Sequence, residues 1–405
     1  MQLPDYFEFM CPVKTGSGAQ ALEHLPSDLS ALDARKPLIL TEKRNRDKGL
    51  VDHLIQAFKT SNLTLGIYDG IDNQSDLSTV KELSRLYLDR GFDSIIALGN
   101  DKVMHVAKIL NIVVSGKPED LKDLKDGGKI RKPLKPLVYI PVITGSCTET
   151  SGDVCLEDLV VTSGYLMPNI VTIDPRMLRD EEPEKVINTG MAALSYAVES
   201  YMCSNRNPLT ETYAQLAIDF VMTHLLNLVK NSLDEKGRLK ALIHEFKAKN
   251  ERIALANAAC MAGYVYANTS KGLAATLGMH VADASGIPQG IAMGIVLPYV
   301  LEFAGRKKGM DLSIIMRPMA GLEIYCCTPE SQRFDNAVGR IRQLQNELFN
   351  LTAGRVPRTL EDAKISKKTL EEIAAKVGEN AGDGFEKDVC RMILEHAFNG
   401  KPVTP

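Results

Sequence analysis

The chain has 405 residues, of which 44% are hydrophobic and 24% charged, and its formal net charge is −3 at pH 7. This length and composition allow a large buried core and favour two domains over one. Because the net charge is close to zero and no basic run is interleaved with aromatic residues, we expect no nucleic-acid partner and no charged membrane-binding surface. Small molecules or other proteins remain as partners.

The cysteines and the N-terminus indicate the compartment. The eight cysteines show no C-x-x-C spacing, so neither a zinc knuckle nor a disulfide framework is expected. We interpret them as mostly buried thiols in a reducing environment. The N-terminal residues lack the basic and apolar regions of a signal peptide, and no apolar run approaches membrane-spanning length. We therefore expect a cytoplasmic protein that is not associated with a membrane.

The first half of the chain alternates between short apolar runs and amphipathic stretches. The stretches predict helices over residues 50–59, from Ser75 or Asp76 to Gly91, and over 103–114. The apolar runs predict strands over residues 37–41, 63–68, 93–98, 137–142 and 170–174. Strands that alternate with helices predict a mostly parallel, doubly wound α/β sheet.

The second half, from residue 184 onward, has the periodicity of helices and no clear strand. We expect a domain boundary near Pro183, with an α/β domain over residues 1–183 and an all-α domain over residues 184–405. The predicted helices span residues 184–203, 210–230, 251–277, 291–304, 336–351 and 368–379. The charged segment 231–249 is expected to be a solvated helix face or loop.

In an open α/β sheet, ligands bind beyond the carboxyl ends of the strands, where helix N-termini can hold phosphate. The loop after the third predicted strand reads G-N-D-K over residues 99–102. Asp101 places a carboxylate where phosphate charge would lie, which is unfavourable unless Lys102 offsets it. The loop after the fourth predicted strand reads P-V-I-T-G-S-C-T-E-T over residues 141–150. Such a hydroxyl-rich turn is common in any fold, so on its own it is weak evidence for a cofactor.

The stretch Asn188 to Tyr201, N-T-G-M-A-A-L-S-Y-A-V-E-S-Y, resembles the G-M-D-A-L-x-H-A-x-E signature of the iron-containing (group III) alcohol dehydrogenases. In that family the run supplies an aspartate and a histidine to a catalytic divalent metal. The scaffold positions match, among them Glu199. The two ligand positions lie one helical turn apart, and here they hold Ala192 and Tyr196.

The remaining two ligands of that family are histidines, in an H-G-x-A-H-x-L-G run and a P-H-G run. The matching stretches are K-G-L-A-A-T-L-G over 271–278 and P-Q-G over 288–290, so Lys271 and Gln289 stand at the ligand positions. Alanine offers no donor atom, and tyrosine, lysine and glutamine are poor ones, so we expect no metal. Extra residues lie within His280–Ser285, where His280 and Asp283 could rebuild a site only with a third ligand on this predicted loop.

The resemblance also implies pyridine-nucleotide binding by a Rossmann-like domain. Loop 99–102 corresponds to the family's G-G-G-S-x-x-D run, of which only Gly99 is kept, and loop 141–150 corresponds to its P-T-T-A-G-T-G-S-E-V run. Glu42 follows the first predicted strand, where an acidic residue would accept hydrogen bonds from an adenosine ribose and favour NAD over NADP. The alternative is a solvent-exposed glutamate. The implied NAD contacts are Glu42, Gly99, Asn100, Lys102, Thr144, Gly145, Ser146 and Glu149.

By resemblance, then, the chain is an NAD(P)-linked oxidoreductase of a small alcohol, aldehyde or other metabolite, and a homodimer or larger homo-oligomer. Lys271 and Tyr196 are the catalytic candidates: the ammonium would polarise a carbonyl or hold an acid group, and the phenol would supply a proton. Alternatively, Lys271 points out of an inactive cleft while Tyr196 fills space. The competing functions are a non-catalytic protein that binds a metabolite or partner, and a metal-free lyase or imine-forming enzyme that uses Lys271.

Overall fold

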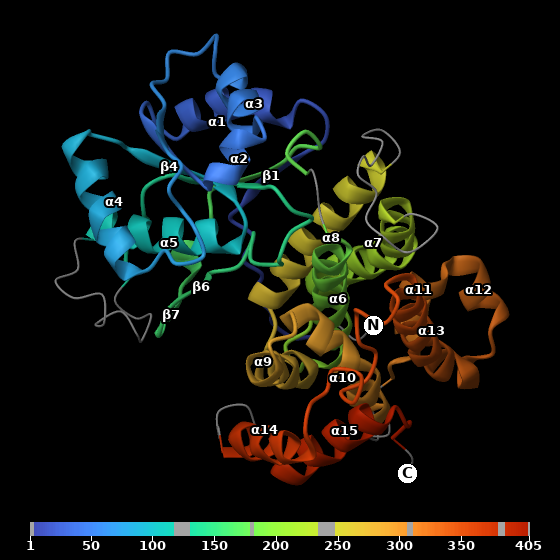
Figure 1. Cartoon of the computed structure of the whole chain (residues 1–405). Helices are drawn as coiled ribbons and strands as arrows, with labels where there is room; N and C mark the ends of the chain where they lie inside the picture. The colour runs from blue at the N-terminus through green and yellow to red at the C-terminus, as the bar shows by residue number, and fades with distance from the viewer. Residues whose placement is uncertain are drawn as a thin grey trace. The chain divides into compact units, whose positions relative to one another are not determined.

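The computed structural model describes residues 4–116, 130–178, 182–233, 248–305, 311–379 and 385–403 (Figure 1). Most of the charged segment 231–249 lies outside these residues. The chain forms two compact units, one of residues Met10–Asp180 and one of Met1–Phe9 together with Glu181–Pro405. The first is an α/β unit and the second is helical.

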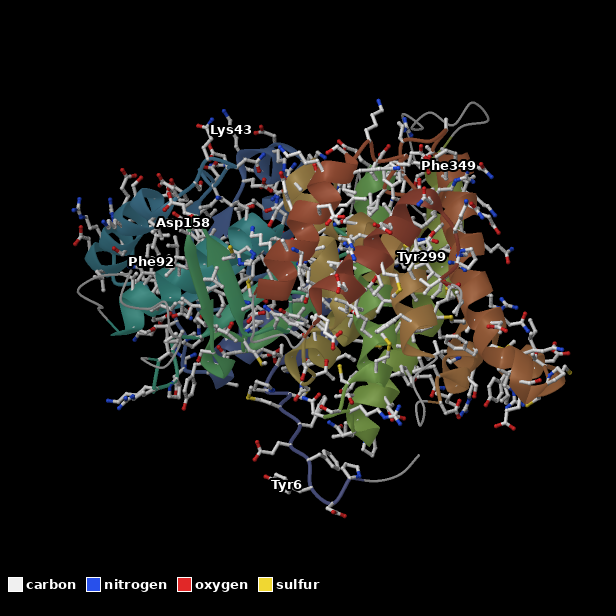
Figure 2. All side chains as sticks on the ribbon, turned by 90° about the horizontal axis from the view of Figure 1, so that it is seen from below. Tyr6, Lys43, Phe92, Asp158, Tyr299 and Phe349 are labelled. Carbon is white, nitrogen blue, oxygen red and sulfur yellow. The ribbon has the colours of Figure 1, made fainter. Side chains whose placement is uncertain are left out.

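The α/β unit contains a six-stranded parallel sheet in the order β1-β8-β5-β4-β2-β3, which confirms the predicted doubly wound arrangement. Its strands are β1 (Lys14–Ser17), β2 (Pro37–Thr41), β3 (Gly66–Tyr68), β4 (Ser94–Gly99), β5 (Leu137–Pro141) and β8 (Ile170–Ile173). The edge strand β1 was not expected, because its K-T-G-S sequence is mostly exposed and carries no apolar run. An antiparallel hairpin of β6 (Asp153–Leu156) and β7 (Leu159–Thr162) was also not expected; Asp158 lies in its turn (Figure 2).

Helices cover both faces of the sheet, which explains why its inner strands are continuously apolar. On one face, Ile39, Ile96, Leu98 and Ile140 pack in a buried cluster with α1 (Leu25–Ala31) and α3 (Leu50–Ala57). The helices α4 (Leu77–Asp89) and α5 (Asp101–Gly116) lie on the other side of the sheet, and the short α2 (Lys43–Asp47) follows β2 (Figure 1). Asp76 caps α4 with its side chain, as the sequence indicates.

The described part of the second unit is helical, as predicted. Its central helices are α6 (Pro183–Glu199), α7 (Pro208–Ser232), α8 (Lys249–Ala267), α9 (Leu273–Ser285) and α10 (Gln289–Ala304). The remaining helices are α11 (Met316–Ala320), α12 (Leu322–Cys327), α13 (Glu330–Leu351), α14 (Lys367–Glu379) and α15 (Lys387–Asn399).

Two expectations about this unit are wrong. The single helix predicted over residues 251–277 is broken into α8 and α9, because residues 268–272 (N-T-S-K-G) are poor helix formers and Gly272 has extended backbone at the start of α9. Residues 280–285, expected to form a loop, instead make up the last turns of α9, which ends at Gly286 in the left-handed conformation (φ +74°).

The surface also differs from expectation at the cysteines. Only Cys147, Cys260 and Cys390 are buried and Cys203 is half-buried, whereas the other four are exposed. The expectation of mostly buried thiols is therefore wrong for four of the eight cysteines. Among the helices that the structure describes, none is both long enough and apolar enough to cross a bilayer.

Glycines allow the starts of α9 and α10 to approach α6 closely. A Cβ atom at Gly290 would lie 2.0 Å from the backbone oxygen of Asn188, and the amide N–H of Gly290 donates to Oδ1 of Asn188 at 2.7 Å. At Gly272, a Cβ atom would lie 2.3–2.5 Å from the carboxyl atoms of Glu199. Side chains at either position would therefore push these segments apart.

The carboxyl group of Glu199, at the C-terminal end of α6, caps the N-terminus of α9. Its two oxygens accept hydrogen bonds from the backbone N–H groups of Ala274 and Ala275, the latter at 2.9 Å. Glu199 is buried, and this desolvation raises the pKa of its carboxyl to about 7, although both hydrogen bonds act to lower it. The cap fixes where the segment between α8 and α9 ends.

Replacing Gly272 by alanine is expected to lower the free energy of unfolding by about 1–3 kcal/mol, because the new methyl group overlaps the buried carboxyl of Glu199. The matched control is Gly339→Ala on α13, where a Cβ atom meets nothing within 4 Å and the better helix former should stabilise the chain by up to ~1 kcal/mol. Urea unfolding of both variants measures the difference. Equal effects of the two substitutions would contradict the described contact.

Glu199→Gln should change how stability depends on pH. The folded wild type keeps its proton at Glu199 up to about pH 7, whereas the unfolded chain loses it near 4.5, so the contribution of this group to stability falls as pH rises between these values. We expect the wild type to lose about 2 kcal/mol relative to Glu199→Gln between pH 5 and pH 8. Chemical denaturation at both pH values tests this, with the exposed Glu371→Gln as control. Parallel pH profiles for wild type and Glu199→Gln would refute the assignment.

Candidate functional site

The helical unit brings together the four positions at which the resembling family holds its metal. Ala192 and Tyr196 lie one turn apart on α6, Lys271 lies in the break before α9, and Gln289 begins α10. Ala192 is buried, Tyr196 is half-buried, and Lys271 and Gln289 are exposed. The glycine contacts and the Glu199 cap hold these three segments against one another.

A second aromatic residue, Tyr266, contacts both catalytic candidates. The Nζ atom of Lys271 lies 6.0 Å from the ring centroid of Tyr266, and the Tyr266 and Tyr196 centroids lie 4.8 Å apart with the rings tilted by 53°. The ring of Tyr266 thus stabilises the ammonium by a cation–π interaction while it packs on the other phenol. Tyr266 was not among the sequence candidates, although its place five residues before Lys271, at the end of α8, was the available signal.

The donor atoms at these positions do not fit a divalent transition metal. A methyl group, a phenol, an ammonium and an amide replace the carboxylate and imidazole ligands that such an ion requires. His280 and Asp283 do not rebuild a site, because His280 is buried in α9 whereas Asp283 is exposed. Within the described ranges, no three or more His, Cys, Asp or Glu side chains form a cluster able to hold a metal ion.

A cavity of about 500 Å³ lies beside Lys271. Its walls come from the end of α6 and the turn after it, from the break between α8 and α9, from the end of α10 and from the start of α15. Glu199 and Cys203 contribute to its wall. The thiol of Cys203 donates to the carbonyl oxygen of Ser270 at 3.3 Å, and burial raises the pKa of this thiol to about 11, so it is neutral at pH 7.

In the α/β unit, the N-terminus of α5 is closed by the chain's own side chains. Gly99 is required for packing, because a Cβ atom there would lie 2.4 Å from Cγ2 of Val103. The Oδ1 atom of Asn100 accepts a hydrogen bond from the backbone N–H of Val103 at 3.3 Å, the kind of N–H group that would otherwise bind phosphate. Asp101 follows at the first position of the helix, with the half-buried Lys102 beside it.

The loop after β5 is a compact turn built by its own hydroxyl groups. The backbone N–H of Ser146 donates to Oε1 of Glu149 at 2.6 Å, and the Ser146 and Thr148 hydroxyls are 2.7 Å apart. Gly145 has φ +111°, a conformation that L side chains rarely adopt, and Thr144 is fully buried. The hydroxyl of Thr148 lies 3.5 Å from Oδ1 of Asp101, so this loop adjoins the start of α5.

Two carboxyl groups and one ammonium share this buried region. Burial raises the pKa of Asp101, and burial together with the nearby charge of Asp101 raises that of Glu149 to about 7. Oε2 of Glu149 is buried and has no hydrogen-bond partner in the described part of the chain. The fully buried Lys108 offsets the negative charge; its ammonium donates to the carbonyl oxygens of Ser151 and Asp153, both at 2.8 Å, and burial lowers its pKa to about 8.

Lys108 was not a sequence candidate, although a lysine within the apolar helix predicted over residues 103–114 was the signal for it. Its neighbour His105 ties α5 to the hairpin, because its Nδ1 atom accepts a hydrogen bond from the backbone N–H of Cys155 at 3.3 Å. Burial lowers the pKa of His105 to about 3, so this imidazole is neutral at pH 7. Both side chains attach α5 to the backbone of residues 151–155 by hydrogen bonds.

Glu42 is not the solvent-exposed residue that the alternative interpretation required. It is 7% exposed, and its Oε2 atom forms an ion pair with Nη2 of Arg44 at 2.9 Å. Nδ2 of Asn100 donates to its Oε1 atom at 3.5 Å, so Glu42 and Asn100 meet at the adjacent ends of β2 and β4. Among the described residues, Oε1 has only this long contact, and it is able to accept another hydrogen bond.

The side chains at the ends of β2, β4 and β5 suit a ribose of a dinucleotide but disfavour its diphosphate. Glu42 offers a carboxylate acceptor suited to a ribose hydroxyl, and Ser146 and Thr148 offer hydroxyl groups. At the helix N-terminus, where a diphosphate would lie, Asn100 already binds an N–H group and Asp101 adds an acidic group. The carboxyl of Asp101, whose pKa is raised by burial, opposes a diphosphate there whenever it is ionised.

Comparisons with known proteins agree with this division of the chain. Residues 12–175 match the family model described as iron-containing alcohol dehydrogenase, and residues 186–386 match the model of the C-terminal part of the Fe-containing alcohol dehydrogenase family. A long-chain-alcohol dehydrogenase of Geobacillus thermodenitrificans is 25% identical over 402 residues, which cover 96% of both chains.

Solved structures share the fold. A 1,3-propanediol oxidoreductase superimposes with a TM-score of 0.82 at 19% identity, over 97% of this chain and 100% of that one. A sulfoacetaldehyde reductase from Bifidobacterium kashiwanohense, solved in complex with NAD⁺, superimposes with a TM-score of 0.79 at 16% identity, over 97% of this chain and 99% of that one. With family models matched across most of its length, the chain belongs to the iron-containing alcohol dehydrogenase family.

Proposed function

We propose that the chain is an oxidoreductase that interconverts a small alcohol and the corresponding carbonyl compound with NAD and works without a resident metal. The family match across both units supports the reaction class. The observation that carries the proposal is the set of side chains at the four ligand positions, which offers an ammonium and a phenol in place of metal ligands. We also propose that the protein is cytoplasmic and, on the basis of the family alone, that it self-associates.

Each proposed role follows from the chemistry of a side chain. Bound NAD would supply or accept the hydride, and Glu42 with the hydroxyls of loop 144–149 would hold it. Lys271 is exposed beside the cavity and carries a charge that would hold the substrate oxygen. Tyr196 would exchange the proton with that oxygen, since a phenol can act as a general acid or base. Tyr266 would position both groups.

A second candidate function is the binding of a metabolite without catalysis. The observation that favours it is the acidic N-terminus of α5, where Asn100 occupies an N–H group and Asp101 opposes phosphate. A cavity of about 500 Å³ in the helical unit is large enough for a small ligand and does not depend on the cofactor. Cofactor affinity therefore separates the two functions.

Asp101→Asn should tighten NADH binding by about tenfold, because it removes a carboxylate from the position of the diphosphate. The measurement is a fluorescence titration with NADH and NADPH, with and without added ferrous or zinc ion. Asp158→Asn, in the exposed turn of the β6–β7 hairpin, makes the same charge change away from the loop and should leave affinity unchanged (Figure 2). NADH binding that is insensitive to metal supports the proposal, and absence of binding even to Asp101→Asn leaves the metabolite-binding function.

Tyr196→Phe should lower kcat by about 100-fold or more with little change in KM, because it removes the proposed proton donor but keeps the ring that packs on Tyr266. The comparison is Tyr266→Phe, which retains the second ring and should keep most of the activity. Steady-state kinetics before and after treatment with a chelator provide the readout. Loss of activity on chelation would contradict the proposed metal independence, and equal losses in the two variants would rule out Tyr196 as the proton donor.

A further inference from the structure

The cavity beside Lys271 is lined by both polar and apolar residues. Its polar lining includes Lys271, Ser270 and Ser204, together with the buried carboxyl of Glu199. Phe303, Phe385 and Val389, from the end of α10 and the start of α15, line the apolar part. A volume of about 500 Å³ suits a small amphipathic molecule.

The charges of the lining residues determine which polar group of a ligand the cavity favours. Lys271 is the only cation among the described residues that line it, and it forms no hydrogen bond or ion pair with the part of the chain that the structure describes. The carboxyl of Glu199 does not compete for the ammonium, because its two oxygens bind the N-terminus of α9. Cys203 carries a neutral thiol at pH 7. The other charged lining residue, Glu386, is exposed.

An ammonium group has three donor hydrogens and no acceptor, so it can hold a carboxylate oxygen and a neighbouring hydroxyl or carbonyl oxygen at once. A neutral alcohol provides only the second of these interactions. An acid with its oxygen on the adjacent carbon provides both, and its chain can extend along the aromatic and aliphatic wall.

We propose that this cavity binds 2-hydroxy and 2-oxo acids with a short apolar side chain, with the carboxylate and the adjacent oxygen on Lys271 and the side chain against Phe303 and Phe385. The proposal rests on the proposed function, of which it names the substrate class. It assigns Lys271 as the residue that selects acids over neutral alcohols.

The test is calorimetric titration of the full chain with three matched probes: 2-hydroxyhexanoate, 1,2-hexanediol and hexanoate. The diol replaces only the carboxylate, and hexanoate lacks only the hydroxyl. We expect 2-hydroxyhexanoate to bind about tenfold more tightly than the diol and severalfold more tightly than hexanoate.

Variants then locate the interaction. Lys271→Met should weaken binding of the hydroxy acid about tenfold and that of the diol only about twofold, because the diol loses one interaction and no ion pair, whereas Lys368→Met, at an exposed lysine of α14, should change neither. Phe303→Ala should weaken both ligands alike, because both present the same chain to it. Circular dichroism confirms that each variant is folded, which is expected of Lys271→Met since Lys271 is exposed.

The proposal is overturned if the diol binds as tightly as the hydroxy acid, if Lys271→Met leaves the acid's affinity within about twofold, or if none of the three probes binds at about 50 mM. The outcomes separate it from the proposed function. Binding of the hydroxy acid without NAD-linked turnover supports the proposed ligand of the cavity and contradicts the proposed enzymatic function. Turnover of neutral alcohols with no preference for acids supports the proposed oxidoreductase function and contradicts the proposed selection of acids by Lys271.

Discussion

The hydrogen bonds from the N-terminus of α9 to the buried carboxyl of Glu199 determine where the candidate site lies. A carboxyl taken out of water is destabilised unless it is paired, and a helix N-terminus offers the needed donors together with a favourable dipole. In this chain both oxygens are bound to backbone N–H groups, and Gly272 lets the chain pass against them. The residue immediately before that glycine is Lys271, so the position of the proposed substrate-binding ammonium follows from a backbone contact.

In the α/β unit, a helix N-terminus is capped by local residues instead of by a distant one. The start of α5 receives a side-chain cap from Asn100 and an acidic residue, Asp101, so its N–H groups and dipole are satisfied from within the chain. The buried Lys108, which is also part of α5, balances the negative charge of Asp101 and Glu149. An anion that binds here must compete with these internal partners, and cofactor affinity is therefore the property on which the two candidate functions differ most.

The sequence predicts the scaffold well because the scaffold is encoded locally. Buried strands such as β2 and β4 are nearly continuous apolar runs. The start of α4 is marked by Asp76, whose own side chain caps the helix. What fails is what depends on distant partners. The exposed strand β1 has no pattern of its own, and the break before α9 depends on a carboxyl more than seventy residues earlier in the chain.

The site residues divide in the same way. Positions 192, 196, 271 and 289 are found by resemblance, since the motifs around them are local. Tyr266 and Lys108 are not, because their roles arise from a ring contact with Tyr196 and from carbonyl oxygens on a different element. Glu42 was placed correctly at the end of its strand, but its burial and its ion pair with Arg44 could not be read from its neighbours.

Charge balance explains how this scaffold tolerates the replaced ligands. In family members that keep the metal ligands, a divalent ion and one ligand aspartate together leave a single net positive charge at the four positions. Here Ala192, Tyr196 and Gln289 are uncharged and Lys271 carries one positive charge, so the net charge at these positions is the same. The chemistry is nevertheless different, because a metal ion accepts lone pairs from several directions, whereas an ammonium donates three hydrogens and keeps them. The substitution therefore preserves attraction for an oxygen-bearing substrate, weakens Lewis-acid activation, and leaves proton exchange to a neighbouring group such as the Tyr196 phenol.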